Sequence, residues 1–389
     1  MISRTVTRLA AVALILAFAI IGSGPVTAAD PIKIGAALSL TGRFSDSAKY
    51  VQEGYQLWLQ EVNAHGGING RPVQLITYDD ESNPDTAAVL TERLISRDGV
   101  VAILGPYSSP ITDAAATVAE RAGVPMLGTI ASDSSIWERR KLHWTVQAFP
   151  SSTYDHEGFL KVIASKGKAI KHLAIVYEES PFSIGAKNWA MGEAKKMGLS
   201  AEAFGYAPGS QDFSSIVERL IASKADAVSM GGYYQPSIAL TRKMIERGYS
   251  PVAYHFIQAA DGVTKTALAD NANGIFGRSA WESTFTDSAS KTFTAAYKAK
   301  FNRLPSYHSA AAYAAGQVLE AAIKAKGPDK NGIRDFITTA TMPTVLGTYK
   351  LNSKLQQEGY RYTLTQWVNG ESKVVRDPAQ ALWPKPAWK

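Results

Sequence analysis

Apolar runs alternate with amphipathic segments along most of the chain. The apolar run Ile32–Leu40 predicts a strand, and the segment Ser45–His65 carries apolar residues on one helical face before Gly66-Gly67 ends the helix. The alternation continues with strands predicted at 73–78, 100–105 and 124–127 and helices predicted at 85–96 and 112–122. This order is typical of a parallel sheet with helices on both faces.

A second series of the same kind begins after Phe149-Pro150. It alternates predicted helices at 153–165, 184–197, 213–223 and 236–247 with predicted strands at 172–177, 201–206, 227–230 and 253–257. Later segments predict a strand at 274–278, helices at 288–301 and 308–326, and short strands at 347–351 and 362–368. The pattern therefore predicts an α/β fold with two doubly wound parallel-sheet lobes, and enough further chain to cross back to the first lobe.

The first 29 residues have the features of an export signal. Arg4 and Arg8 are basic, Leu9–Ile21 is apolar, and small residues at 22–29 suit cleavage after Ala28 or Ala29. The apolar run is shorter than the ~20 residues that a membrane-spanning helix needs. We therefore predict a signal peptide over residues 1–29, its cleavage, and a mature protein in the periplasm.

Composition narrows the class of protein. The 389 residues include no Cys, which excludes disulfides, Cys-ligated metal sites, cysteine nucleophiles and a lipid anchor on cysteine. Lys and Arg exceed Asp and Glu by 41 to 34, and cleavage of the signal removes two Arg, so the net charge falls from +7 to +5. The basic residues form only short clusters, so we predict no nucleic-acid partner.

Loops that follow predicted strands carry candidate binding residues, because ligands of α/β folds bind beyond the carboxyl ends of the strands. Tyr107, Ser108 and Ser109 precede a helix whose first turn has free N–H groups, which suits a carboxylate. Hydroxyl residues also follow the next strand, at 129–132, and Tyr233 follows a strand of the second lobe.

Each candidate also has a structural interpretation. Ser and Thr before a helix usually cap it, tyrosines at 233 and 234 would more often pack, and Asp261 would more often cap a helix beginning at Gly262. The run Asp155-His156-Glu157 is the nearest approach to a catalytic cluster, but a solvated helix start is favoured. Because nucleotide, metal and nucleophile motifs are missing from the sequence, we predict no cofactor, no metal site and no enzyme.

Several short motifs are more specific. The segment Gly66-Gly67-Ile68-Asn69-Gly70-Arg71 is followed by Asp79-Asp80, and it is flanked by Pro31–Gly35, Leu40-Thr41-Gly42 and Gly105-Pro106. Together they resemble the periplasmic leucine/isoleucine/valine-binding proteins, the type I solute receptors of ABC importers for hydrophobic amino acids and amides. The resemblance covers Pro31 to about Trp383, nearly the whole mature chain.

This resemblance implies two lobes that are joined by three crossovers and close on a ligand in the cleft between them. The N-terminal lobe would comprise residues 30–149 and about 280–345, and the C-terminal lobe residues 150–279 and about 346–389. Ser109 corresponds to the serine that binds the ligand carboxylate. Ile130 and Ser132 correspond to residues that complete the contacts to the carboxylate and the ammonium group.

The second lobe supplies the remaining matches. Phe182 and Tyr233 correspond to ligand-side tyrosines, and Asp261 corresponds to the glutamate that pairs with the ligand ammonium group. Two departures from the family pattern concern specificity. Ser47 replaces a tryptophan, which should enlarge the side-chain pocket, and His308 is expected at the cleft, where it could pair with a second carboxylate or a polar side chain.

The resemblance implies the substrate-binding component of an ABC transporter. We expect a monomer that binds a branched-chain, other apolar or aromatic amino acid by lobe closure and delivers it to an inner-membrane permease. Two alternatives stay open: a receptor for an amide or an aromatic carboxylate, and a binding protein that signals to a membrane kinase or chemoreceptor.

Overall fold

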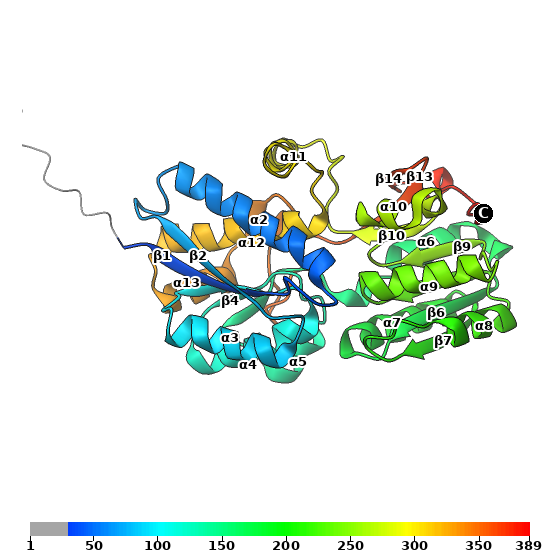
Figure 1. Ribbon diagram of the computed structural model, residues 1–389, viewed down its shortest axis with the longest axis horizontal. Helices are drawn as coiled ribbons and strands as arrows, with labels where there is room; N and C mark the ends of the chain where they lie inside the picture. Colours follow the sequence, from blue (N-terminus) through cyan, green and yellow to red (C-terminus); the bar gives the residue numbers. More distant parts are fainter. Residues whose placement is uncertain (1–29) are drawn as a thin grey trace, which may run out of the picture.

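The computed structural model describes residues 30–389, so the predicted signal peptide lies outside the described residues. Two α/β lobes lie end to end (Figure 1), and each is built around one mainly parallel sheet. No helix within residues 30–389 is both long and apolar enough to cross a membrane. The predicted fold class, two doubly wound lobes, is confirmed.

The first sheet has five parallel strands in the order β2-β1-β3-β4-β5. Its strands are β1 (Ile32–Leu38), β2 (Val73–Asp79), β3 (Ala102–Leu104), β4 (Met126–Gly128) and β5 (Thr145–Gln147). Helices α3 (Pro84–Ser96) and α4 (Ser109–Ala122) cover one face, whereas α2 (Ser45–Ala64) and α12 (Tyr307–Lys326) cover the other (Figure 1). A helix from late in the chain therefore completes the first lobe.

Small residues allow α12 to pack closely against α2. Ala310, Ala311, Ala312, Ala314 and Ala315 are buried in the same core as the α2 side chains. Gly316 lies so near the Trp58 ring that a Cβ atom there would come within 2.4 Å of it. The alanine-rich composition of this helix explains the close packing.

Five further elements complete the first lobe: α5 (Ser135–Arg140), α11 (Ser288–Phe301), α13 (Lys330–Thr339) and the hairpin of β11 (Met342–Thr344) and β12 (Gly347–Tyr349). Of these, α5, α13 and β11, together with β5, were not predicted. The strands β5 and β11 have only three residues each and lack the apolar run that marks the equally short β3 and β4, so the hydrophobic pattern does not reveal them.

The second sheet has the strand order β14-β13-β10-β9-β8-β6-β7. Only the pairs β10-β13 and β13-β14 are antiparallel. Its strands are β6 (His172–Glu178), β7 (Ser200–Tyr206), β8 (Ala227–Gly231), β9 (Ala253–Phe256), β10 (Phe276–Ser279), β13 (Thr363–Val368) and β14 (Glu371–Val374). The last strand was not predicted.

Helices cover both faces of this second sheet. Along β6, Leu173 and Ile175 pack with α6 (Glu157–Ser165) and α7 (Pro181–Lys196), whereas Ala174 and Val176 pack on the opposite face. The helices on that opposite face are α8 (Ser214–Ser223), α9 (Tyr234–Glu246) and α10 (Val263–Leu268). Successive side chains of a strand point to opposite faces of the sheet, so a strand that is buried on both faces needs apolar residues at consecutive positions, as β6 has.

The chain passes between the lobes three times. The first passage follows Phe149, the second follows Ser279, and the third comes later than the predicted position near residue 346. Tyr349 belongs to the first-lobe core, and the backbone N–H of Gln357 donates to the carbonyl of Gln147 at 3.0 Å. The chain therefore stays with the first lobe until about residue 360, because the hairpin and its extension pack beside β5.

Candidate functional site

A small cavity lies between the lobes, beyond the carboxyl ends of the strands. The lobes are closed over it, so the remaining volume is only about 10 Å³, roughly the room for one water molecule. Eight of the ten predicted site residues line it: Tyr107, Ser108, Ser109, Ile130, Ser132, Phe182, Tyr233 and His308. Ser47 and Asp261 do not, and the three other lining residues are Phe149, Gln258 and Arg278. We call this space the inner cavity.

The loop after β3 brings the backbone and two serine hydroxyls to the inner cavity. It passes close to β4, since a Cβ atom on Gly105 would lie 2.2 Å from the carbonyl oxygen of Leu127. Ser108 has a φ of 78° and directly precedes α4, yet its buried hydroxyl has no hydrogen-bond partner among the described residues. The Ser108 hydroxyl therefore does not cap α4, and the capping interpretation is wrong for this residue. The hydroxyl is free to donate a hydrogen bond to an oxygen atom of a ligand.

Ser109 and Ser132 lie on neighbouring loops of the first lobe. The Ser109 hydroxyl accepts a hydrogen bond from the backbone N–H of Asp133 at 3.1 Å. The carbonyl of Ser132 accepts one from the backbone N–H of Ser152, at 2.7 Å, where the chain first crosses between the lobes. The loop that carries Ile130 and Ser132 is thus tied both to the start of α4 and to the first crossover.

Aromatic side chains from both lobes meet at the inner cavity. The Tyr233 ring of the second lobe lies 4.6 Å from Phe44 and 6.4 Å from Tyr107 of the first, between ring centroids. Phe182 packs on the same tyrosine at 5.3 Å.

An ion pair also joins the lobes outside this aromatic cluster. Arg43 and the buried Glu178 lie 3.2 Å apart across the lobes. Any solute must therefore enter while the lobes are further apart.

The Tyr107 side chain lies beside Ser47, the residue from which a larger side-chain pocket was expected. The Tyr107 hydroxyl accepts a hydrogen bond from the amide nitrogen of Gln258 at 2.9 Å. Burial raises the pKa of Tyr107 to about 12, against the opposing effect of hydrogen bonds to Ser47 and Gln258. Ser47 therefore lies against this tyrosine and is not among the lining residues of the inner cavity, and the larger pocket expected from Ser47 stays a prediction.

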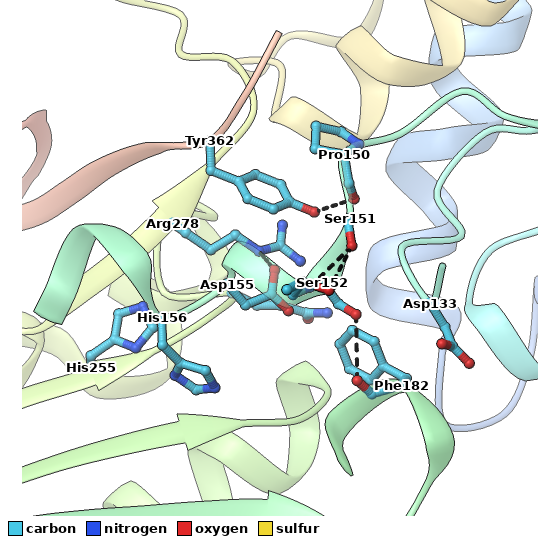
Figure 2. Close-up of polar contacts among 12 residues, drawn as sticks. Asp133, Pro150, Ser151, Ser152, Asp155, His156, Phe182, His255, Arg278 and Tyr362 are labelled. Carbon is cyan, nitrogen blue, oxygen red and sulfur yellow. Dashed lines mark hydrogen bonds and ion pairs between the residues drawn. The ribbon is translucent and has the colours of Figure 1, made fainter. Parts of the chain in front are cut away.

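Arg278 is the charged group of the inner cavity that the sequence did not reveal. Its guanidinium lies beneath the Tyr362 ring, 4.2 Å from the centroid, and its Nε donates to Asp155 at 2.8 Å (Figure 2). Burial alone would lower the pKa of Arg278. Asp155 and the surrounding tyrosines raise this pKa by more than burial lowers it, so the pKa of Arg278 lies above its ordinary value. The guanidinium is therefore charged, and its Nη1 has no hydrogen-bond partner within residues 30–389.

The Asp155-His156 pair is buried rather than a solvated helix start, which corrects the sequence prediction. Burial raises the pKa of Asp155 to about 6, although Arg278 opposes the rise. His156 Nδ1 contacts the Ser229 hydroxyl at 2.8 Å, and the same hydroxyl contacts His255 at 2.8 Å. Burial lowers the pKa of His156 to about 4, so this histidine is neutral at physiological pH and belongs to the second-lobe core.

Asp261 is buried beside the inner cavity but does not line it. Its Oδ2 lies 3.2 Å from Nδ1 of His308, which does line the cavity. Its side chain does not cap the following helix, whose N-cap is Gly262, so the capping interpretation is wrong within the described structure. The predicted contact between Asp261 and a ligand ammonium group would require His308 to move.

Unpaired polar atoms from both lobes surround the inner cavity. Four lining residues of the described chain have a buried polar atom without a hydrogen-bond partner: Ser108, Tyr233, Gln258 and Arg278. A buried polar group without a partner typically costs about 1–3 kcal/mol, so a ligand that supplies partners gains binding energy here. Residues 30–389 contain no cluster of three or more His, Asp or Glu arranged to hold a metal ion.

Two of the missed residues carried a usable signal. Gln258 directly follows the predicted strand 253–257, and Arg278 ends the predicted strand 274–278, so both lie at carboxyl ends of strands. Phe149 carried no such signal, because it comes two residues after β5, a strand that was not predicted.

Comparisons with known proteins agree with this arrangement. The family profile described as periplasmic binding protein matches residues 31–372. The Leu/Ile/Val-binding protein homolog 8 of Brucella melitensis biotype 1 is 30% identical over 365 residues, which cover 88% of this chain and 90% of the relative. The match extends across both lobes and all three crossovers.

Two solved structures share the fold. The branched-chain amino acid transporter substrate binding protein LivJ from Streptococcus pneumoniae, in complex with isoleucine, has a TM-score of 0.80 at 22% identity and covers 89% of this chain and 99% of its own. An ABC transporter solute binding protein from R. palustris, in complex with benzoate, has a TM-score of 0.81 at 18% identity and covers 92% and 98%. From this match of profile and relatives over both lobes, the chain belongs to the leucine/isoleucine/valine-binding family of periplasmic binding proteins.

Proposed function

We propose that this protein binds a small organic acid with an apolar or aromatic body between its lobes and delivers it to an inner-membrane ABC permease. The observation that carries the proposal is the set of donors around the inner cavity. Ser108 and Ser109 at the start of α4 line the same cavity as Arg278 of the other lobe. Hydroxyl, helix N-terminal and guanidinium donors are the groups that bind a carboxylate best.

Two ligand classes fit these donors. An aromatic or apolar acid without an amine is favoured because no carboxylate side chain of the described chain lines the inner cavity, whereas an arginine does. The benzoate bound by the R. palustris neighbour belongs to this class. An amino acid is the second candidate, since the unpaired oxygens of Tyr233 and Gln258 could accept hydrogen bonds from an ammonium group, and the relatives are Leu/Ile/Val-binding protein homologues.

The family and the signal-like segment 1–29 support export and association with a permease. The mature protein then acts as a receptor in the periplasm and not as an enzyme. Lobe closure around the solute would present one surface, made by both lobes, to the permease.

A thermal-shift screen of the mature protein tests the ligand class. It compares benzoate and 3-phenylpropanoate with leucine and phenylalanine, and with benzamide as the neutral control. A ligand at one hundred times its Kd stabilises the folded state by about 2.7 kcal/mol, a readily measured shift in Tm. Shifts with the acids alone support the first class, and shifts with the amino acids alone support the second. Stabilisation by benzamide but by no carboxylate would contradict the carboxylate site.

A further inference from the structure

A larger cavity lies behind the inner cavity, on the far side of the Asp261-His308 contact. It has a volume of about 540 Å³ and is formed by α2 and the start of α12 from the first lobe and by β13, β14 and the loop after β9 from the second. Asp261 lines this outer cavity, whereas His308 lines the inner one. The 3.2 Å contact between them therefore separates the two spaces.

The outer cavity has an excess of acidic groups. Asp261 is 2% exposed, and its Oδ1 has no hydrogen-bond partner in the described structure. Glu282 is a second buried acid in the wall, and Glu371 lies at the rim 3.5 Å from Lys373, the one basic residue among the described residues of the lining. A buried carboxylate oxygen without a donor favours a positively charged partner.

Aromatic rings form much of the remaining wall. Trp281 and Tyr307 are almost fully buried there, and Tyr50 and Trp367 complete the set. The Tyr307 hydroxyl also lacks a hydrogen-bond partner among residues 30–389. The faces of tryptophan and tyrosine rings attract cations, by about 0.5–2 kcal/mol for each well-placed contact. A carboxylate beside several such rings is the usual composition of a site for an organic ammonium group.

We propose that the outer cavity binds a small organic cation, with Asp261 as its counter-ion and the rings of Trp281 and Trp367 as its apolar wall. This site is distinct from the inner cavity and does not depend on the identity of the transported solute. Because both lobes supply its wall, a bound cation also favours the closed arrangement of the lobes.

The burial of Glu282 is consistent with this assignment. Burial raises the pKa of Glu282 to about 8, and nearby Asp261 adds to the rise, so this acid is neutral at pH 7. Its oxygens can then accept a hydrogen bond without a second full charge in the cavity. Asp261 is the other buried acid of this lining, and its Oδ1 has no hydrogen-bond partner among the described residues.

Fluorine NMR of the protein labelled with 5-fluorotryptophan tests the proposal. The chain has eight Trp, and the variants Trp281→Phe and Trp367→Phe assign the two resonances of interest. The probes are phenethylamine, 2-phenylethanol and 3-phenylpropanoate, which share a ring and differ in charge. We expect phenethylamine to shift the Trp281 or Trp367 resonance saturably, and the alcohol and the carboxylate to shift neither at the same concentration.

Matched variants locate the bound amine. Asp261→Asn should weaken phenethylamine binding at least tenfold, and Asp261→Ser, which removes the same charge, provides a second test if the first variant folds poorly. Asp270→Asn removes one exposed acidic charge elsewhere and should change the affinity less than twofold. Equal shifts with the alcohol and the amine, or unchanged amine affinity in both outer-cavity variants, would overturn the proposal. So would loss of amine binding in Ser108→Ala without loss in Asp261→Asn, because the probe would then occupy the inner cavity.

Discussion

Nδ1 of His308 lies 3.2 Å from Oδ2 of Asp261, and this buried contact forms the wall between the two cavities. The sequence suggested that both residues would face the ligand. Instead, His308 lines the inner cavity and Asp261 lines the outer one. The site proposed for the solute and the site proposed for the cation therefore have different lining residues.

The first prediction concerns the carboxylate site. Ser109→Ala should weaken binding of the solute about tenfold, because the substitution removes a donor and leaves the backbone N–H of Asp133 without its 3.1 Å partner. Isothermal titration calorimetry with the solute identified by the screen measures the change. Thr117→Ala, which removes an exposed hydroxyl from the same helix, is the control. Equal affinities for Ser109→Ala and the native protein would remove Ser109 from the site.

The second prediction concerns the buried ion pair of Arg278 and Asp155. Arg278→Gln should lower the free energy of unfolding by about 3–5 kcal/mol at pH 7.5, because it leaves the Asp155 carboxylate buried without its 2.8 Å partner. Urea denaturation measures the loss. The double variant Asp155→Asn with Arg278→Gln should lose less than the single variant, since no uncompensated charge remains.

This loss should also depend on pH. The pKa of Asp155 is raised to about 6 even beside Arg278, so without the arginine the carboxyl is protonated at pH 5. The destabilisation by Arg278→Gln should therefore be smaller at pH 5 than at pH 7.5. A penalty of the same size at both values would show that it does not arise from the charge on Asp155.

The third prediction concerns Glu282 and the pH dependence of stability. Because its folded-state pKa is about 8 against an ordinary value of 4.5, the folded state holds a proton that the unfolded state has lost between these values. The free energy of unfolding should therefore fall as pH rises from about 5 to 8, and level off above pH 8.

Comparison with Glu282→Gln isolates this contribution from those of the other buried groups. Relative to the native protein, the variant should gain about 1 kcal/mol or more between pH 5.5 and pH 8.5, measured by urea denaturation. Glu371→Gln changes a largely exposed acid of the same cavity and should show no such gain. A constant difference between native protein and Glu282→Gln would mean that Glu282 titrates normally.

The fourth prediction concerns the backbone of the site. Gly105→Ala should destabilise the protein by about 1–3 kcal/mol and weaken solute binding, because its Cβ would lie 2.2 Å from a backbone carbonyl of β4. Gly185→Ala on α7 meets no heavy atom within 4 Å, and it should stabilise the protein by about 0.5–1 kcal/mol. Scanning calorimetry distinguishes the two, and a neutral Gly105→Ala would contradict the close approach of the two strands.

The hydrophobic pattern was sufficient for the two-lobed architecture, and the rule that α/β proteins bind ligands beyond strand ends was sufficient for most of the inner cavity. The hydrophobic pattern and the strand-end rule both use local information. The period of a helix or strand, and the loop that follows it, can be recognised within a short stretch of sequence. The loops after β3 and β4 were predicted for this reason.

Tertiary packing alone decided which charges meet. Asp155 and Arg278 are 123 residues apart, so no local pattern pairs them, and the same holds for Asp261 and His308. Packing also kept the chain with the first lobe until about residue 360 and buried the Asp155-His156 pair. Burial changes the free energy of a charged group by several kcal/mol, and the burial of a residue depends on segments distant in sequence.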